Sequence, residues 1–195
     1  MKTRNVAAYA QLHTERTYGN TAVRMRRFIE PWVQIAAPSS ILDYGAGQGG
    51  FVDVINAPSA TVRHSYDPAI PTLATLPQNS YDYVLCIDVL EHLEPDEVGA
   101  VLADVAKLSQ NALFIVTTAP ARAVLPDGRN AHTTVRPGRW WGEEIKKAFG
   151  HAAAVPVFRK NRSGFKTYAS NAPDWLRFWS KLAVAELKQQ TTRHP

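Results

Sequence analysis

Residues 41–51, ILDYGAGQGGF, place an acidic side chain directly before a cluster of glycines. Asp43 ends a short run of strand-forming residues, and Gly45, Gly47 and Gly49 follow at alternate positions. Glycine permits a tight turn and allows a ligand to approach the backbone, which side chains would prevent. In α/β sheets, ligands bind at such turns, beyond the carboxyl ends of the strands. The stretch therefore indicates a ligand site, and a purely structural turn is the alternative.

A second acid, Asp67, ends the next strand-like segment, TVRHSYDP. A carboxylate at that position is able to accept hydrogen bonds from both hydroxyls of a ribose. The glycine run fits two templates, Asp-x-Gly-x-Gly-x-Gly and the dinucleotide fingerprint Gly-x-Gly-x-x-Gly. A nicotinamide enzyme needs either a substrate domain or a Tyr-x-x-x-Lys pair. The chain is too short for a large second domain, and no tyrosine is followed by a lysine at this spacing. We therefore expect a different nucleoside-containing cofactor.

The elements that must position these residues alternate between strands and helices. Short apolar or alternating runs predict strands over residues 40–45, 61–68, 81–90 and 111–119. Apolar spacing and flanking signals predict helices over residues 20–36, 49–57, 95–109 and near 140–150. Residues 155–170 read as two further strands around Asn161 to Gly164, an antiparallel hairpin at the sheet edge. The pattern predicts an α/β fold with a doubly wound, mostly parallel sheet.

Length and composition fit one folded domain over residues 1–195, since 45% of the residues are hydrophobic and 20% are charged. Within it we expect a helical segment over 1–36 and a substrate loop over 120–145. The sequence shows neither a membrane-length apolar run nor a secretory signal, so we expect a cytoplasmic protein. The single cysteine, Cys86, lies in an apolar run, which excludes a disulfide framework or a cysteine-based metal site.

Charge is segregated along the chain. Counting Lys and Arg against Asp and Glu, residues 1–35 carry +4, residues 36–119 carry −8 and residues 120–195 carry +9. The acidic centre argues against a polyanion as its ligand, whereas the basic ends are able to face an anionic substrate. A solvated basic surface is the alternative.

Residues 76–95, LPQNSYDYVLCIDVLEHLEP, resemble the fourth-strand motif of class I S-adenosylmethionine-dependent methyltransferases. With LDYGAGQGG and Asp67, the resemblance covers residues 41 to about 120. It implies a Rossmann-like methyltransferase fold, with a mostly parallel seven-stranded sheet and a C-terminal antiparallel hairpin. It also implies S-adenosylmethionine as the cofactor.

The resemblance assigns the cofactor-binding residues. Asp43 and the three glycines would line the methionine part, Asp67 would hold the ribose, and Asp88 would lie near the methionine amino group or the methyl. A cap for the following turn is the alternative role for Asp88. Between Asp67 and Leu76 the family often has an acid near the adenine, and this chain has none. Adenine recognition would then fall to backbone groups and apolar contacts.

Methyl transfer requires alignment of the acceptor and, for a hydroxyl acceptor, a base. His132 and His92 are the candidates, although either side chain has a plain structural alternative. Arg129, Arg139 and Trp140 combine guanidinium groups with flat apolar surface, which suits sugar phosphates, nucleotides or single-stranded nucleic acid. Core packing is the alternative for the tryptophan.

Three functions fit these observations. The first is O- or N-methylation of a small or carbohydrate-like acceptor, with no metal and no membrane. The second is methylation of RNA or another polyanion through the basic ends. The third is a catalytically inactive cofactor-binding protein that serves as a partner subunit. The sequence does not identify the acceptor or the oligomeric state.

Overall fold

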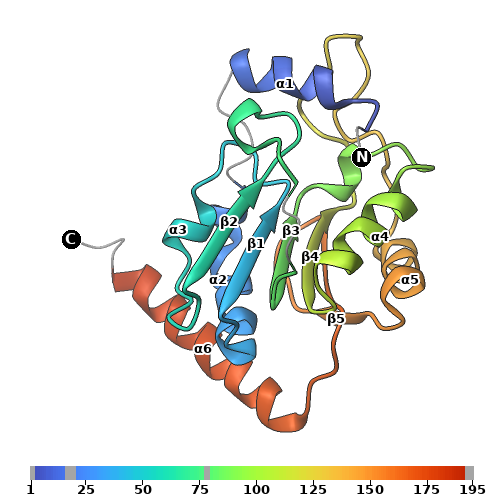
Figure 1. Cartoon of the computed structure of the whole chain (residues 1–195). Helices are drawn as coiled ribbons and strands as arrows, with labels where there is room; N and C mark the ends of the chain where they lie inside the picture. Colours follow the sequence, from blue (N-terminus) through green and yellow to red (C-terminus); the bar gives the residue numbers. More distant parts are fainter. Residues whose placement is uncertain (1–2, 16–20, 77–79, 192–195) are drawn as a thin grey trace.

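The computed structural model describes residues 3–15, 21–76 and 80–191. Its strands are β1 (Ser40–Tyr44), β2 (Val62–Tyr66), β3 (Tyr83–Ile87), β4 (Ala112–Thr117), β5 (Ala153–Val155) and β6 (Arg162–Lys166). They form one sheet in the order β2-β1-β3-β4-β6-β5 (Figure 1). β1 to β4 pair in parallel, whereas β6 pairs antiparallel with β4 and β5. The expected α/β fold with a terminal antiparallel hairpin is confirmed.

Helices cover both faces of this sheet. They are α1 (Val6–Glu15), α2 (Thr21–Ala36), α3 (Phe51–Val54), α4 (Val98–Leu108), α5 (Gly138–Phe149) and α6 (Ala172–Thr191), with single 3-10 turns η1 (Pro71–Leu73) and η2 (Leu90–His92). α2, α3 and α6 pack on one face, and α4 and α5 pack on the other. α1 belongs to neither layer, because it lies across the carboxyl ends of the strands (Figure 1).

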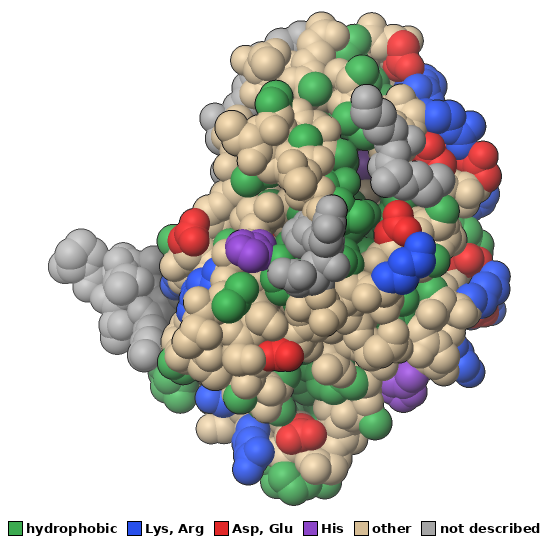
Figure 2. Space-filling model, in the orientation of Figure 1, with side chains coloured by type: hydrophobic (Ala, Val, Ile, Leu, Met, Phe, Trp, Pro, Cys, Tyr) green, Lys and Arg blue, Asp and Glu red, His purple; other side chains and the backbone are tan. Residues whose placement is uncertain are grey.

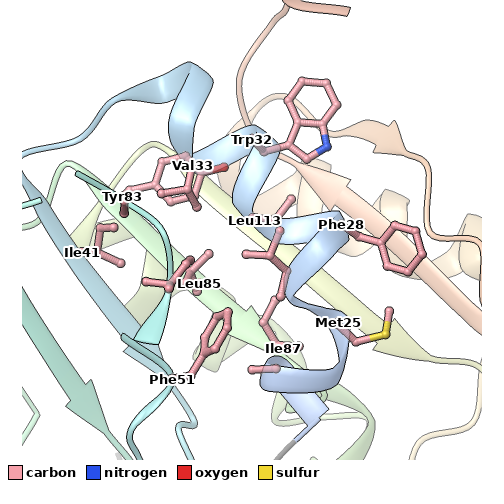
Figure 3. Close-up of a cluster of buried hydrophobic side chains, with 14 of the residues drawn as sticks. Met25, Phe28, Trp32, Val33, Ile41, Phe51, Tyr83, Leu85, Ile87 and Leu113 are labelled. Carbon is pink, nitrogen blue, oxygen red and sulfur yellow. The ribbon is translucent and has the colours of Figure 1, made fainter. Parts of the chain in front are cut away.

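Helix α2 shows how the sequence builds the larger core. Its apolar residues recur every three or four positions and therefore form one stripe, which includes Met25, Phe28 and Trp32. Figure 3 shows this stripe facing side chains of the central strands, such as Leu85 and Leu113. Complete burial of each large apolar side chain contributes about 1.5–3 kcal/mol. β3 and β4 are buried along their whole length, as expected for central parallel strands.

The sheet has six strands in the described residues, so the expected seventh strand was wrong. Between β2 and β3, the described residues 67–76 and 80–82 form only the single turn η1. Pro68 and Pro71 lack the N–H groups that a strand needs for its ladder. The described residues of this connection therefore add no strand to the sheet.

Other boundaries also differ from the sequence-based expectation. The hairpin connection spans residues 156–161, and Gly164 lies inside β6 opposite Val155 rather than in the turn. α3 is one turn long, because Gly50 before it is left-handed and Ile55 after it is extended. The sequence reasoning also missed α6, whose inner face buries Phe178 and Leu182 against α2 and the sheet.

Candidate active site

A cavity opens at the carboxyl ends of β1, β2 and β3, beneath α1. Its wall combines the turn after β1, the loop after β2, the turn after β3 and one side of α1. Residues that are distant in sequence therefore meet at one site. Five of the residues singled out in the sequence line it: Gly45, Gly47, Asp67, Asp88 and His92. Asp43 and Gly49 belong to the same β1 region but are not part of the lining.

The turn after β1 depends on glycine for two reasons. Gly45, Gly47 and Gly49 have φ values of 79°, 57° and 80°, in the left-handed region that favours glycine. The Gly45 N–H donates to the carbonyl oxygen of Tyr66 at 2.7 Å, which ties the turn to the end of β2. A Cβ on Gly45 would lie 2.3 Å from Cγ2 of Val89. Gly45 is therefore required for close packing of the β1 turn against the β3 turn.

Asp67 is held rigidly at the cavity wall. Its Oδ2 accepts the N–H of Gly47 at 2.7 Å, and its Oδ1 accepts the N–H of Ala69 at 2.9 Å. Burial raises the pKa of Asp67, and these two donors oppose that shift. Each carboxylate oxygen keeps a further acceptor position. The arrangement suits a ligand that presents two neighbouring hydroxyls.

Asp43 lies beneath the turn, with only 2% of its surface exposed. Its Oδ2 has no hydrogen-bond partner among the described residues. Burial raises the pKa of Asp43 to about 7, and the charge of Asp67 adds to the shift. An unsatisfied buried oxygen is costly, so it calls for a donor from a ligand or from outside the described residues.

The turn after β3 contains an ion pair that the sequence reasoning missed. Oδ1 of Asp88 accepts hydrogen bonds from Oγ1 of Thr117, at 3.0 Å, and from Nη1 of Arg162. Thr117 ends β4 and Arg162 begins β6, so this cluster joins the parallel and antiparallel parts of the sheet. Beside it, buried Glu91 accepts the Thr117 N–H at 2.8 Å. Burial, with the charge of Asp88, raises the pKa of Glu91 well above its ordinary value.

The two candidate histidines lie together, with ring centroids 5.0 Å apart. Nδ1 of His132 lies 2.6 Å from the carbonyl oxygen of Ala119, and Nδ1 of His92 lies 2.9 Å from that of Ala131. Because a carbonyl only accepts, each Nδ1 carries the proton, and each neutral ring keeps its lone pair on Nε2. Burial lowers the pKa of His92 to about 4 and also lowers that of His132.

Three residues expected to bind substrate lie outside the cavity lining. Arg129 forms ion pairs with Glu94 at 2.6 Å and Asp127 at 2.7 Å, so its guanidinium fastens the loop in place. Arg139 is exposed on α5, and Trp140 packs beside the core formed by α4 and α5. Residues 138–145 of the expected substrate loop are helical.

Helix α1 contributes residues that the sequence reasoning did not single out. Tyr9 and His13 line the cavity, and they share one helix face because they are four positions apart. The hydroxyl of Tyr9 donates to the carbonyl oxygen of Ala131 and lies 2.9 Å from Nδ1 of His92. The spacing of Tyr9 and His13 in the sequence indicates that the two side chains share a helix face. It does not indicate which part of the protein that face contacts.

Comparison with known proteins adds the family. A family model described as a methyltransferase domain matches residues 16–190. The chain belongs to this methyltransferase family. Among curated protein sequences, none matches it significantly.

Solved structures of methyltransferases share the fold. DhpI in complex with SAH superposes with a TM-score of 0.62 at 14% identity, over 83% of this chain and 93% of DhpI. The DhpI-SAM-HEP complex superposes with a TM-score of 0.60 at 13% identity, over 84% of this chain and 94% of that chain. An O-methyltransferase family protein from Burkholderia thailandensis superposes with a TM-score of 0.56 at 15% identity, over 88% of this chain and 65% of that protein. The chain is a class I S-adenosylmethionine-dependent methyltransferase.

The methyltransferase offers groups that fit this cofactor. The unsatisfied Oδ2 of Asp43 lies beneath the glycine turn, and the carboxylate of Asp67 is already oriented by two backbone donors. Asp88 lines the same cavity as Asp67. These acceptors suit an ammonium group and a pair of ribose hydroxyls.

The described part of the methyltransferase shows neither a metal-binding cluster nor a membrane-spanning helix. Within residues 3–15, 21–76 and 80–191, there is no group of three or more His, Cys, Asp or Glu side chains arranged to hold a metal ion. The helices described in those ranges include none with the length and apolar character of a membrane span.

Proposed function

We propose that the methyltransferase modifies a small or carbohydrate-like acceptor at an oxygen or nitrogen atom. The observation that carries this proposal is the position of α1 over the cavity. Tyr9 and His13 face the cavity from α1, opposite Asp67 and Asp88 from the sheet. A cavity covered in this way suits an acceptor that is enclosed with the cofactor, because enclosure excludes water and aligns the reacting atoms.

The cofactor residues have separate roles in this proposal. Asp67 accepts the ribose hydroxyls, Asp43 and the β1 turn hold the methionine part, and Asp88 faces the methionine ammonium. When bound, S-adenosylmethionine supplies a methyl group on a sulfonium, which is a good leaving group. The protein then has to align the acceptor and remove its proton.

His132 is the better candidate for the base. A histidine with a pKa of about 4, such as His92, is a weak base at neutral pH. Burial and the charge of Arg162 lower the pKa of His132, and the carbonyl of Ala119 and the charge of Asp88 oppose this shift. Its Nδ1–H is held by Ala119, so Nε2 is the nitrogen that would accept a proton from a hydroxyl or amino group. His132 is not itself part of the cavity lining, but it contacts His92, which is. In this account His92 packs against the His132 ring and fixes its position.

The alternative polyanionic acceptor has less support. Arg4 pairs with Asp96 and Glu97, and Arg129 pairs with Glu94 and Asp127, so these cations near the cavity are already neutralised. Figure 2 shows positive and negative side chains interspersed on the side that carries α4 and α5, rather than a patch of one sign. Non-specific nucleic acid binding requires a continuous cationic surface.

The test is formation of S-adenosylhomocysteine when the purified protein is incubated with S-adenosylmethionine and panels of acceptors. We expect turnover with small hydroxylated or aminated compounds and no salt-sensitive retention on RNA. Turnover with RNA alone would overturn the proposed acceptor class. Tight cofactor binding without turnover on any panel would support the inactive partner protein instead.

With an active acceptor, His132→Ala tests the base. We expect kcat to fall by roughly 10²–10⁴-fold while affinity for the cofactor is unchanged. His151→Ala, which removes an exposed histidine after α5, is the matched control. An activity that survives His132→Ala would leave His92, or no protein base, as the better account.

A further inference from the structure

The first residue of β6, Arg162, lies at the edge of the site and has no role in the function proposed above. It pairs in register with Thr117, the last residue of β4. Because β6 runs antiparallel, it begins where the parallel strand β4 ends. Arg162 is therefore the contribution of the C-terminal hairpin to the end of the sheet that carries the cavity.

The guanidinium of Arg162 is anchored on one side only. Nη1 donates to Oδ1 of Asp88, which also accepts the hydroxyl of Thr117. Asp88 lines the cavity, so the guanidinium contacts a residue of the cavity wall. The Arg162 side chain keeps 20% of its surface exposed, so it is accessible despite this contact.

Other arginines of the chain show what a structural role requires. Arg63 donates from Nε, Nη1 and Nη2 to four backbone carbonyl oxygens. Arg129 uses Nε, Nη1 and Nη2 on Asp127, Glu94 and Asn5. Among the described residues, the side chain of Arg162 has a single acceptor, at Nη1. A guanidinium has five N–H donors, so most of those on Arg162 remain for a ligand.

Arg162 also lies close to the proposed base. Its positive charge is close enough to contribute to the lowered pKa of His132. His132 in turn packs against His92, which lines the cavity. Arg162, His132 and His92 are thus neighbours from β6, from the loop after β4 and from η2, and the last of them lines the cavity.

We propose that Arg162 binds an anionic group of the methyl acceptor, a carboxylate or a phosphate. The inference rests on the proposed function and specifies its acceptor class. A planar guanidinium matches both anions, because two parallel N–H groups bind two oxygens of one anion. Asp88 holds Arg162 in place through Nη1. The N–H groups of Nε and Nη2 are then left for the anionic group of the acceptor.

The probes are inorganic phosphate and acetate, titrated by NMR into the protein saturated with S-adenosylhomocysteine, at constant ionic strength set with chloride. We expect saturable binding of at least one probe, with a shift of the Arg162 Nε–H signal. Arg162→Met should weaken this binding by about 10-fold or more, the loss expected for charged hydrogen bonds. Arg159→Met removes the same charge from the exposed connection before β6 and should leave binding unchanged.

The outcomes separate this proposal from the proposed function. Stronger binding of phosphate indicates a phosphorylated acceptor, and stronger binding of acetate indicates a carboxylated one. Equal probe binding by wild type and Arg162→Met overturns the proposal, even if S-adenosylhomocysteine binds normally. If Arg162→Met does not fold, an Arg162 Nε–H signal in wild type that fails to move during both titrations overturns it. Failure of wild type to bind S-adenosylhomocysteine would count against the proposed function, and titration of the ligand-free protein would still test Arg162.

Discussion

At the scale of single residues, the carboxylate of Asp67 is well placed to bind the cofactor. Its two oxygens are oriented by the N–H groups of Gly47 and Ala69 and still have acceptor capacity. We predict that Asp67→Ala lowers affinity for S-adenosylmethionine by about 1.5–3 kcal/mol for each charged hydrogen bond that is lost. Isothermal titration calorimetry measures the change. Asp53→Ala, at an exposed acid in α3, is the control, and equal affinity of a folded Asp67→Ala variant would remove Asp67 from the site.

Gly45 makes a prediction about stability. A side chain there meets Val89 at 2.3 Å and also forces a residue with a Cβ to adopt φ +79°. Gly50 has a similar φ, +88°, but open space around the missing Cβ. Gly50→Ala should therefore cost about 1–2 kcal/mol for the left-handed backbone alone. Gly45→Ala should cost about 1–3 kcal/mol more, because of overpacking.

Urea denaturation of the two variants measures this difference. Val89→Ala, combined with Gly45→Ala, should recover the overpacking part of the loss and leave the backbone part. Equal destabilisation of the two glycine variants would show that the contact with Val89 relaxes without cost.

At the scale of elements, Leu12 packs α1 against the loop after β4. This side chain is 1% exposed and packs with Ala123, Leu125 and Ala131 of the loop after β4. We predict that Leu12→Ala weakens the docking of α1 by about 2 kcal/mol, at the low end for buried leucines. Hydrogen exchange in α1 should then accelerate by about 30-fold.

The control for α1 is Val124→Ala, which shortens an exposed side chain on the same loop. It should leave exchange in α1 unchanged. Equal acceleration across α1 and the central strands in Leu12→Ala would contradict local docking, because it would indicate global destabilisation.

The packing of α2 and α6 around β6 encloses Lys166. Its Nζ donates to the carbonyl of Tyr168 and lies 5.2 Å from the ring centroid of Trp32. Burial lowers the pKa of Lys166 to about 8, against the opposing charge of Asp174. The unfolded chain, with its ordinary lysine pKa near 10.5, binds the proton more strongly. The contribution of Lys166 to stability therefore increases as the pH rises from 8 to 10.5.

We predict that, relative to Lys166→Met, wild type gains about 2 kcal/mol in free energy of unfolding between pH 7 and pH 9.5. Urea denaturation of both proteins at the two pH values measures the gain. Tyrosines that titrate in this pH range contribute to the free energy of unfolding of both proteins. Their contribution cancels when the value for Lys166→Met is subtracted from that for wild type. A difference that does not change with pH would show that Lys166 has an ordinary pKa in the folded protein.

At the scale of the whole molecule, the segregated charges of the sequence are brought together by folding. Arg4, from the basic N-terminal part, pairs with Asp96 and Glu97 in the acidic centre. From the basic C-terminal part, Arg129 pairs with Glu94, and Arg162 pairs with Asp88. Three basic side chains thus lie against the acidic segment after β3. The charge pattern reflects assembly of this end of the sheet and gives little support to a nucleic acid surface.

The sequence alone determined the four parallel strands and the glycine turn after β1, because both depend on local patterns. Apolar runs specify central strands, and Gly45 and Gly47 specify a backbone that other residues do not readily adopt. Only the tertiary structure decided which distant side chains meet. The contact between His92 and His132, the pairing of Arg162 with Asp88 and the position of Tyr9 over the cavity all join separate elements. Such contacts depend on strand order and helix packing, and residue spacing along the chain does not encode them.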